Sequence, residues 1–97
     1  MKNLDEIRTV LRTHADTLKR KYGIANLAVF GSVARGSAQE GSDVDILADI
    51  VRPIGLLELA GAENYLIDLL NCEIDLIPRR SVRPELRDEI LAEAVPV

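Results

Sequence analysis

The sequence predicts an α/β fold, a small mixed β-sheet with helices packed against it. Two segments, residues 43–50 and Cys72–Ile77, alternate apolar and polar residues with the period of two that a β-strand shows. A third segment, Ile24–Phe30, is a short apolar run between two glycines, which is typical of a strand buried on both faces. Helical patterns precede, separate and follow these segments. The expected order is therefore helix, strand, helix, strand, helix, strand, helix.

The first element is predicted to be one helix from about Leu4 to Tyr22. Its apolar residues keep to one stripe at helical spacing: Ile7, Val10, Leu11, Leu18 and Tyr22. Asn3 and Glu6 have the spacing of a capping box, and Gly23 is a suitable residue at which the helix can end. His14 lies near the stripe without a nearby cysteine or second histidine, so no ligand or catalytic role is assigned to it.

The predicted strand Ile24–Phe30 leads directly into a tight turn and a short helix. Because Gly31 and Ser32 stand where the strand becomes helical, backbone N–H groups face outward and can cradle a phosphate. The alternative is a plain tight turn, since a P-loop lysine and a third dinucleotide-type glycine are both absent. Arg35 either contacts phosphate or pins the polar loop at residues 37–42.

Acidic residues mark one face of the second and third strands. Residues two apart on a strand project from the same face about 7 Å apart, so Asp43 and Asp45 can grip a common cation, while Val44 and Ile46 face the core. Unpaired like charges this close repel each other, which favours a metal or a basic partner. Asp75, on the polar face of the third strand, meets them if the two strands are neighbours.

Three carboxylates together suit Mg²⁺, which prefers oxygen ligands and keeps positions open for water and substrate phosphates. The alternative is that each aspartate is an ordinary exposed residue, Asp43 in a turn, Asp45 on a strand and Asp75 at a sheet edge. The basic clusters at residues 19–21 and 79–83 are first of all expected to be solvent-exposed surface. Those beyond the third strand are also expected near the rim of an acidic site.

Two more helices are expected. One spans Leu56–Leu70 with a mostly apolar face formed by Leu56, Leu59, Ala60, Glu63, Leu66, Ile67 and Leu70. The other runs from about Pro84 to Ala94, with Ser81 as a candidate cap. Its predicted buried side consists of Leu86, Ile90, Leu91 and Ala94.

The length and composition favour one globular domain over residues 1–97. Of the 97 residues, 47% are hydrophobic and 29% charged, which suits one core. The formal charge of -4 disfavours unspecific binding to nucleic acid or anionic lipid. One cysteine, Cys72, excludes an internal disulfide and a multi-cysteine zinc site. No membrane span or secretory signal is recognised, so a cytoplasmic location is expected.

In combination, these motifs resemble a known signature. The sequence places Gly31-Ser32, then Arg35-Gly36, then Ser42-Asp43-Val44-Asp45, and finally Asp75 after an intervening helix. This order is similar to that of the DNA polymerase β-like nucleotidyltransferase superfamily. Within it the chain resembles the minimal nucleotidyltransferases, the MNT proteins, from the first helix to residues 94–97.

The resemblance implies a fold, an activity and a partner. It implies the nucleotidyltransferase fold, with Gly31 and Ser32 binding the triphosphate of ATP and Asp43, Asp45 and Asp75 binding two Mg²⁺ ions. Members of this kind are often antitoxins that neutralise a HEPN-domain ribonuclease by transferring AMP to a tyrosine. The expected reaction is attack of a hydroxyl on the α-phosphate with release of pyrophosphate, and Asp75 is the candidate general base.

Two other functions stay open. A binding module of the same fold could block the toxin by contact, although three convergent carboxylates, which repel each other, serve no purpose in a mere binding surface. A transferase acting on a small molecule is the second, and the length of 97 residues argues against it because no separate acceptor-binding domain is available.

Overall fold

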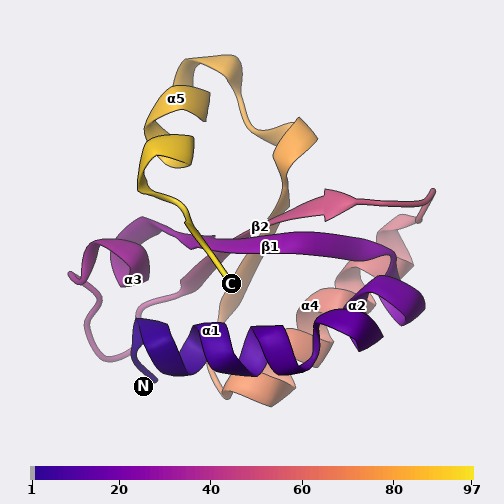
Figure 1. Ribbon diagram of the computed structural model, residues 1–97, viewed down its shortest axis with the longest axis horizontal. Helices are drawn as coiled ribbons and strands as arrows, with labels where there is room; N and C mark the ends of the chain where they lie inside the picture. The colour runs from indigo at the N-terminus through magenta and orange to yellow at the C-terminus, as the bar shows by residue number, and fades with distance from the viewer. Residues whose placement is uncertain (1) are drawn as a thin grey trace.

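The computed structural model describes residues 2–97 and contains one four-stranded sheet (Figure 1). Its strands lie in the order β3-β2-β1-β4. Their bounds are Ile24–Phe30 for β1, Val44–Ile50 for β2, Ile74–Pro78 for β3 and Val95–Pro96 for β4. Strand β1 pairs antiparallel with β2 and β4, while β2 pairs parallel with β3. The predicted mixed sheet is therefore confirmed.

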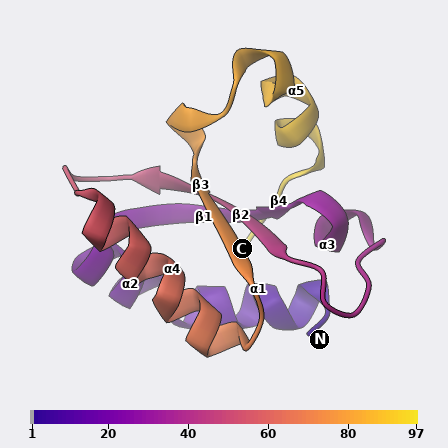
Figure 2. The same ribbon diagram turned by 180° about the vertical axis from the view of Figure 1, so that it is seen from behind.

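Helices lie on both faces of this sheet. They are α1 (Leu4–Thr13), α2 (Ala15–Tyr22), α3 (Gly31–Arg35), α4 (Leu56–Leu70) and α5 (Pro84–Glu93), with a 3₁₀ turn, η1 (Arg79–Ser81), after β3. Helices α1, α2 and α4 cover one face, whereas η1 and α5 stand on the other (Figures 1 and 2). No helix within residues 2–97 is long and apolar enough to cross a membrane.

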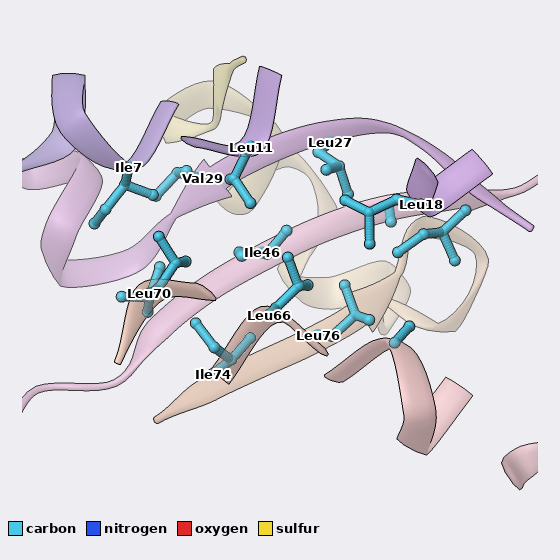
Figure 3. Packing of buried hydrophobic residues seen from close by; sticks show 14 of the residues in the cluster. Ile7, Leu11, Leu18, Leu27, Val29, Ile46, Leu66, Leu70, Ile74 and Leu76 are labelled. Atoms are coloured by element: carbon cyan, nitrogen blue, oxygen red, sulfur yellow. The ribbon is translucent and has the colours of Figure 1, made fainter. Parts of the chain in front are cut away.

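The main core lies between the sheet and helices α1, α2 and α4 (Figure 3). Fully buried side chains there include Ile7, Leu11, Leu18, Val29, Ile46 and Leu66. Each such side chain contributes about 1.5–3 kcal/mol by leaving water. A second, smaller cluster lies under α5, where Ala28, Phe30 and Leu47 contact partly buried residues of the last third of the chain. Most of the apolar packing is therefore on one side of the sheet.

The predicted first helix is divided at His14, which leaves helical geometry at φ −102° and ψ 8°. There the His14 ring hydrogen-bonds to the Tyr65 hydroxyl of α4 over 3.0 Å. The break therefore coincides with a tertiary contact that lies outside the pattern of the helix itself. The capping box of Asn3 and Glu6 is present, and Gly23 ends α2 in the left-handed conformation, as predicted.

The predicted faces of the later helices are partly wrong. Leu56 is 85% exposed, because only the later turns of α4 reach the core. Leu86 and Leu91 are 43% and 50% exposed, since the small cluster under α5 covers few of its positions. Ser81 is not the cap, because it belongs to η1 and the helix begins after Arg83 without a side-chain cap.

The strand limits also differ from the prediction. Strand β3 begins at Ile74 rather than Cys72 and includes Pro78. Strand β4 was not expected, because two residues are too few to show a periodicity. It forms where Val95 and Pro96 lie beside Val29 and Ala28 of β1.

Candidate active site

The turn between β1 and α3 begins at a glycine that no other residue can replace without strain. Gly31 has φ +73°, and a Cβ built on it would overlap the Asp45 carboxylate, lying 3.0 Å from Cγ. A side chain here would meet both a left-handed backbone and a steric clash. The turn and the acidic strand are therefore in direct contact.

Ser32 follows at the start of α3 and is half-buried. Its backbone carbonyl accepts a hydrogen bond from the Ser37 N–H over 2.9 Å, while its hydroxyl donates none to the residues that the structure describes. This hydroxyl is thus available to a ligand. Its role in binding phosphate stays a prediction.

The strand register brings the predicted acidic residues to one edge of the sheet. Asp45 of β2 stands beside Asp75 of β3 in the parallel ladder and beside Phe30, the last residue of β1, in the antiparallel one. Asp43 immediately precedes β2 and is exposed, as is Asp75. The condition that the two acidic strands be neighbours is met.

These carboxylates influence one another. The pKa of Asp45 is raised above its ordinary value, first by burial and then by the negative charges of Asp75 and Asp43. Arg35 opposes the rise and Glu93 adds to it. A carboxylate in this position is destabilised when ionised and gains from a nearby cation.

Oxygen donors of this kind fit a hard cation such as Mg²⁺. In the conformation described, however, no three His, Cys, Asp or Glu side chains of residues 2–97 are gathered closely enough to hold a metal ion. The donor type of Asp43, Asp45 and Asp75 fits the predicted metal, but their arrangement does not form a closed site. The role itself stays a prediction.

Glu93, the last residue of α5, also belongs to this site and was missed in the sequence. Its carboxylate accepts a hydrogen bond from the Gly31 N–H over 3.0 Å and pairs with the Arg35 guanidinium at 3.0 and 3.2 Å. The Arg35 and Gly31 hydrogen bonds hold the pKa of Glu93 below its usual value. No sequence pattern pointed to Glu93, because the contact joins residues 62 positions apart.

Comparison with known proteins now identifies the family. Residues 11–97 match the family model described as Nucleotidyltransferase domain. The chain belongs to this family. The predicted family and enzyme class, a nucleotidyltransferase, are therefore confirmed.

Relatives of similar length match most of this nucleotidyltransferase. It is 38% identical over 95 residues to the protein adenylyltransferase MntA of Thermococcus cleftensis, and the match covers 98% of this chain and 96% of that one. It is 50% identical over 82 residues to MJ0126 of Methanocaldococcus jannaschii, covering 84% of each chain; that protein's name gives protein adenylyltransferase as a provisional activity.

Solved structures share the fold of the nucleotidyltransferase. One, described as a candidate minimal nucleotidyltransferase, superposes with a TM-score of 0.81 at 35% identity and covers 99% of this chain and 97% of that chain. Another contains a tri-AMPylated Shewanella oneidensis HEPN toxin in complex with an MNT antitoxin. Its matching chain superposes with a TM-score of 0.60 at 17% identity, covering 95% of this chain and 66% of that chain, which shows likeness of fold alone.

Two arginines of the nucleotidyltransferase lie differently from the sequence-based expectations. Arg35 pairs with Glu93, a contact that neither of its two predicted roles included; phosphate binding by Arg35 stays a prediction. Arg79 pairs with Asp49 over 3.0 Å. Since Asp49 is four residues beyond Asp45 on β2, Arg79 lies about 13 Å along the sheet from the acidic edge.

Proposed function

We propose that this nucleotidyltransferase is the antitoxin of a HEPN toxin and transfers AMP from ATP to a hydroxyl, that of a tyrosine, on the toxin. The observation that carries the proposal is the close approach of Gly31, at the start of the turn, to the carboxylate of Asp45, which stands beside Asp75 in the neighbouring strand. In this arrangement, groups that can donate hydrogen bonds to phosphate lie beside carboxylates that can bind a cation. The names of the adenylyltransferase relatives and the AMPylated toxin in a neighbouring structure support the protein substrate.

Each residue of the site has a role in this proposal. The N–H groups that follow Gly31 in the turn and the Ser32 hydroxyl bind the triphosphate, because the Gly31 N–H itself donates to Glu93. Asp43, Asp45 and Asp75 would hold two Mg²⁺ ions, which would neutralise the phosphates and lower the pKa of the attacking hydroxyl. The hydroxyl oxygen forms a bond to the α-phosphorus as the bond to pyrophosphate breaks. Asp75, which is more exposed than Asp45, accepts the hydroxyl proton or passes it to water.

The open surface over the site favours an acceptor that comes in trans. Asp43 and Asp75 are exposed, so the described residues leave these two carboxylates open to solvent. A protein acceptor can supply the missing wall and hold its hydroxyl in line with the leaving group.

The test is to mix the protein with a HEPN-domain protein, taken from the adjacent gene where that gene encodes one, together with ATP and Mg²⁺, and to measure intact masses. We expect the partner to gain whole AMP units, and we expect no gain with Asp45→Asn or without divalent metal. An unmodified partner in a stable, inhibited complex would contradict the proposal and favour the binding module. Modification of a small acceptor but never of the partner would favour the small-molecule transferase.

A further inference from the structure

Glu93 connects the C-terminal helix to the turn that carries the candidate site. Its side chain is 22% exposed, against 54% for its partner Arg35. Both carboxylate oxygens are engaged: Oε1 accepts from the Gly31 N–H and from Arg35, and Oε2 accepts a second hydrogen bond from Arg35. Both Arg35 hydrogen bonds come from one nitrogen, Nη1, and hydrogen bonds between charged groups are stronger than those between neutral ones.

Gly31 lies between two carboxylates. On one side its N–H donates to Glu93, and on the other its Cα faces the carboxylate of Asp45 with no room for a Cβ. Glycine in the left-handed region has wide conformational freedom, so this hydrogen bond restricts where Gly31 lies. Any shift of Gly31 changes the space open to the Asp45 side chain.

The charge of Glu93 needs compensation at this place. A fourth carboxylate beside Asp43, Asp45 and Asp75 raises the cost of ionising Asp45 and opposes the approach of a triphosphate. Arg35 supplies the compensation, since its guanidinium pairs with both oxygens of Glu93. The pair is therefore close to neutral and leaves the geometry of the turn as its main effect.

We propose that Glu93 is a positioning residue for nucleotide binding: through Gly31 and Arg35 it fixes the turn against Asp45 without touching the reacting atoms. The proposal deepens the proposed function and depends on it, because it concerns the binding of MgATP at the same site. It makes the C-terminal helix part of the nucleotide site.

Two other roles of Glu93 predict different effects on the affinity for nucleotide. If the Glu93 carboxylate merely occupied the place of a phosphate oxygen on the Gly31 N–H, nucleotide would have to displace it, and removal of Glu93 would tighten binding. If Glu93 only joined α5 to α3 for stability, its removal would lower the melting temperature and leave the affinity for nucleotide unchanged. The direction of the change in affinity therefore separates the three roles.

The experiment measures the dissociation constant of MgATP by calorimetry for the wild type, Glu93→Ala and Glu93→Gln. We expect Glu93→Ala to weaken binding roughly tenfold, as the loss of charge-assisted hydrogen bonds implies. Glu93→Gln keeps an oxygen that can accept from Gly31 but loses the charge facing Arg35, so a smaller loss is expected. Glu89→Ala is the matched control, because Glu89 is exposed on the same helix; its affinity should equal that of the wild type.

A second readout does not depend on nucleotide. The amide proton of Gly31 should shift upfield in Glu93→Ala and stay near its wild-type position in Glu93→Gln and Glu89→Ala, because a carboxylate or amide oxygen still accepts from it. Tighter or unchanged MgATP binding in both Glu93 variants would overturn the proposal. If Glu93→Ala fails to fold, Glu93→Gln alone decides, through its affinity for MgATP and the change in chemical shift of the Arg35 side chain. Wild-type protein that binds MgATP but leaves the HEPN partner unmodified would contradict the proposed function and not this inference.

Discussion

At the scale of single residues, two glycines show how one backbone conformation serves different ends. Gly31 and Gly36 both have positive φ, +73° and +76°, on either side of the short helix α3. A Cβ at Gly31 would meet Asp45, whereas a Cβ at Gly36 would have nothing within 4 Å. Only the first glycine is therefore tied to the chemistry of the site.

This pair allows a matched test of the site. Alanine at either position forces a left-handed non-glycine residue and should lower the free energy of unfolding by about 1–2 kcal/mol. Gly31→Ala should in addition push the Asp45 carboxylate aside and remove nearly all AMP transfer. Gly36→Ala should keep transfer near the wild-type rate, and urea unfolding with a transfer assay checks both. Equal loss of activity in the two variants would show that the Asp45 contact is unimportant.

The raised pKa of Asp45 leads to a second prediction. Its ionised form is disfavoured in the folded protein by burial and by Asp75 and Asp43, so Asp45→Asn should slightly raise the melting temperature without divalent metal. The same change should remove nearly all transfer activity. Thermal unfolding in a chelator and the intact-mass assay give the two values. A less stable Asp45→Asn protein would contradict the repulsion inferred here.

Ser32 provides the third test at this scale. In Ser32→Ala the backbone N–H groups still face the phosphates. The affinity for MgATP should therefore fall only modestly, in contrast to the nearly complete loss of transfer activity expected in Asp45→Asn. Loss of one hydroxyl bound to a charged group is worth roughly 1.5–3 kcal/mol. Calorimetric titration of the wild type and Ser32→Ala with MgATP measures the difference in affinity. Equal affinities would make Ser32 a turn residue only.

At the scale of elements, an irregular point in β1 is linked by side-chain hydrogen bonds to β2 and to η1. The register of β1 against β2 shifts between Ala25 and Ala28, and Asn26 there has φ +55°. Its amide donates to Asp49 of β2 over 2.8 Å, and Asp49 also pairs with Arg79 beyond β3. Side-chain bonds thus cross the sheet at the end away from the acidic edge.

Asn26 can be tested with two substitutions. Asn26→Gly keeps the left-handed backbone and loses only the hydrogen bond, whereas Asn26→Ala also adds backbone strain. We expect losses of about 0.5–1 and 1–2 kcal/mol in the free energy of unfolding, respectively. For a chain of this size 1 kcal/mol shifts the melting temperature by about 4–8 °C, so calorimetry resolves the two. An alanine variant as stable as the glycine variant would refute the strain.

Asp49 predicts how stability depends on pH. Its pKa lies below the ordinary 3.8, chiefly because Asn26 and then Arg79 hydrogen-bond to the ionised form. The stabilisation is therefore complete above about pH 3.8 and is lost as the pH falls through the lower, folded value. Asp49→Asn should cost about 0.2–1 kcal/mol at pH 7, as expected of an exposed pair, and clearly less near pH 2. Asp88→Asn, exposed on α5, is the control, and unfolding curves at both pH values decide.

Comparison of particular elements shows what the sequence could reveal. The bounds of β1 and α4 were predicted correctly, because glycines limit β1 and a sustained apolar pattern marks α4. The acidic edge was also predictable, since strand periodicity places side chains on faces. The break at His14, strand β4 and the Glu93 contact were not, because each depends on a partner far away along the chain.

At the scale of the whole molecule, the two faces of the sheet are unequally covered. The face under α1, α2 and α4 holds the large core, whereas α5 contributes no buried residue and the cluster beneath it is small. Segments with few buried apolar contacts open most easily. The weaker face is also the one that carries Asp45 and Glu93.

The pairing of β4 with β1 also affects the order in which the contacts of the chain form during folding. The pairing of Val95 with Val29 closes a loop over most of the chain, and distant contacts form late because closing long loops costs entropy. Hydrogen exchange during refolding should protect the amides of β1 that face β2 first and that of Val97, which bonds to the distant Leu27, last. Simultaneous protection would contradict this order. Since Glu93 belongs to the late segment, a newly made chain would hold its three aspartates in place before it gained the contact that completes the turn beside them.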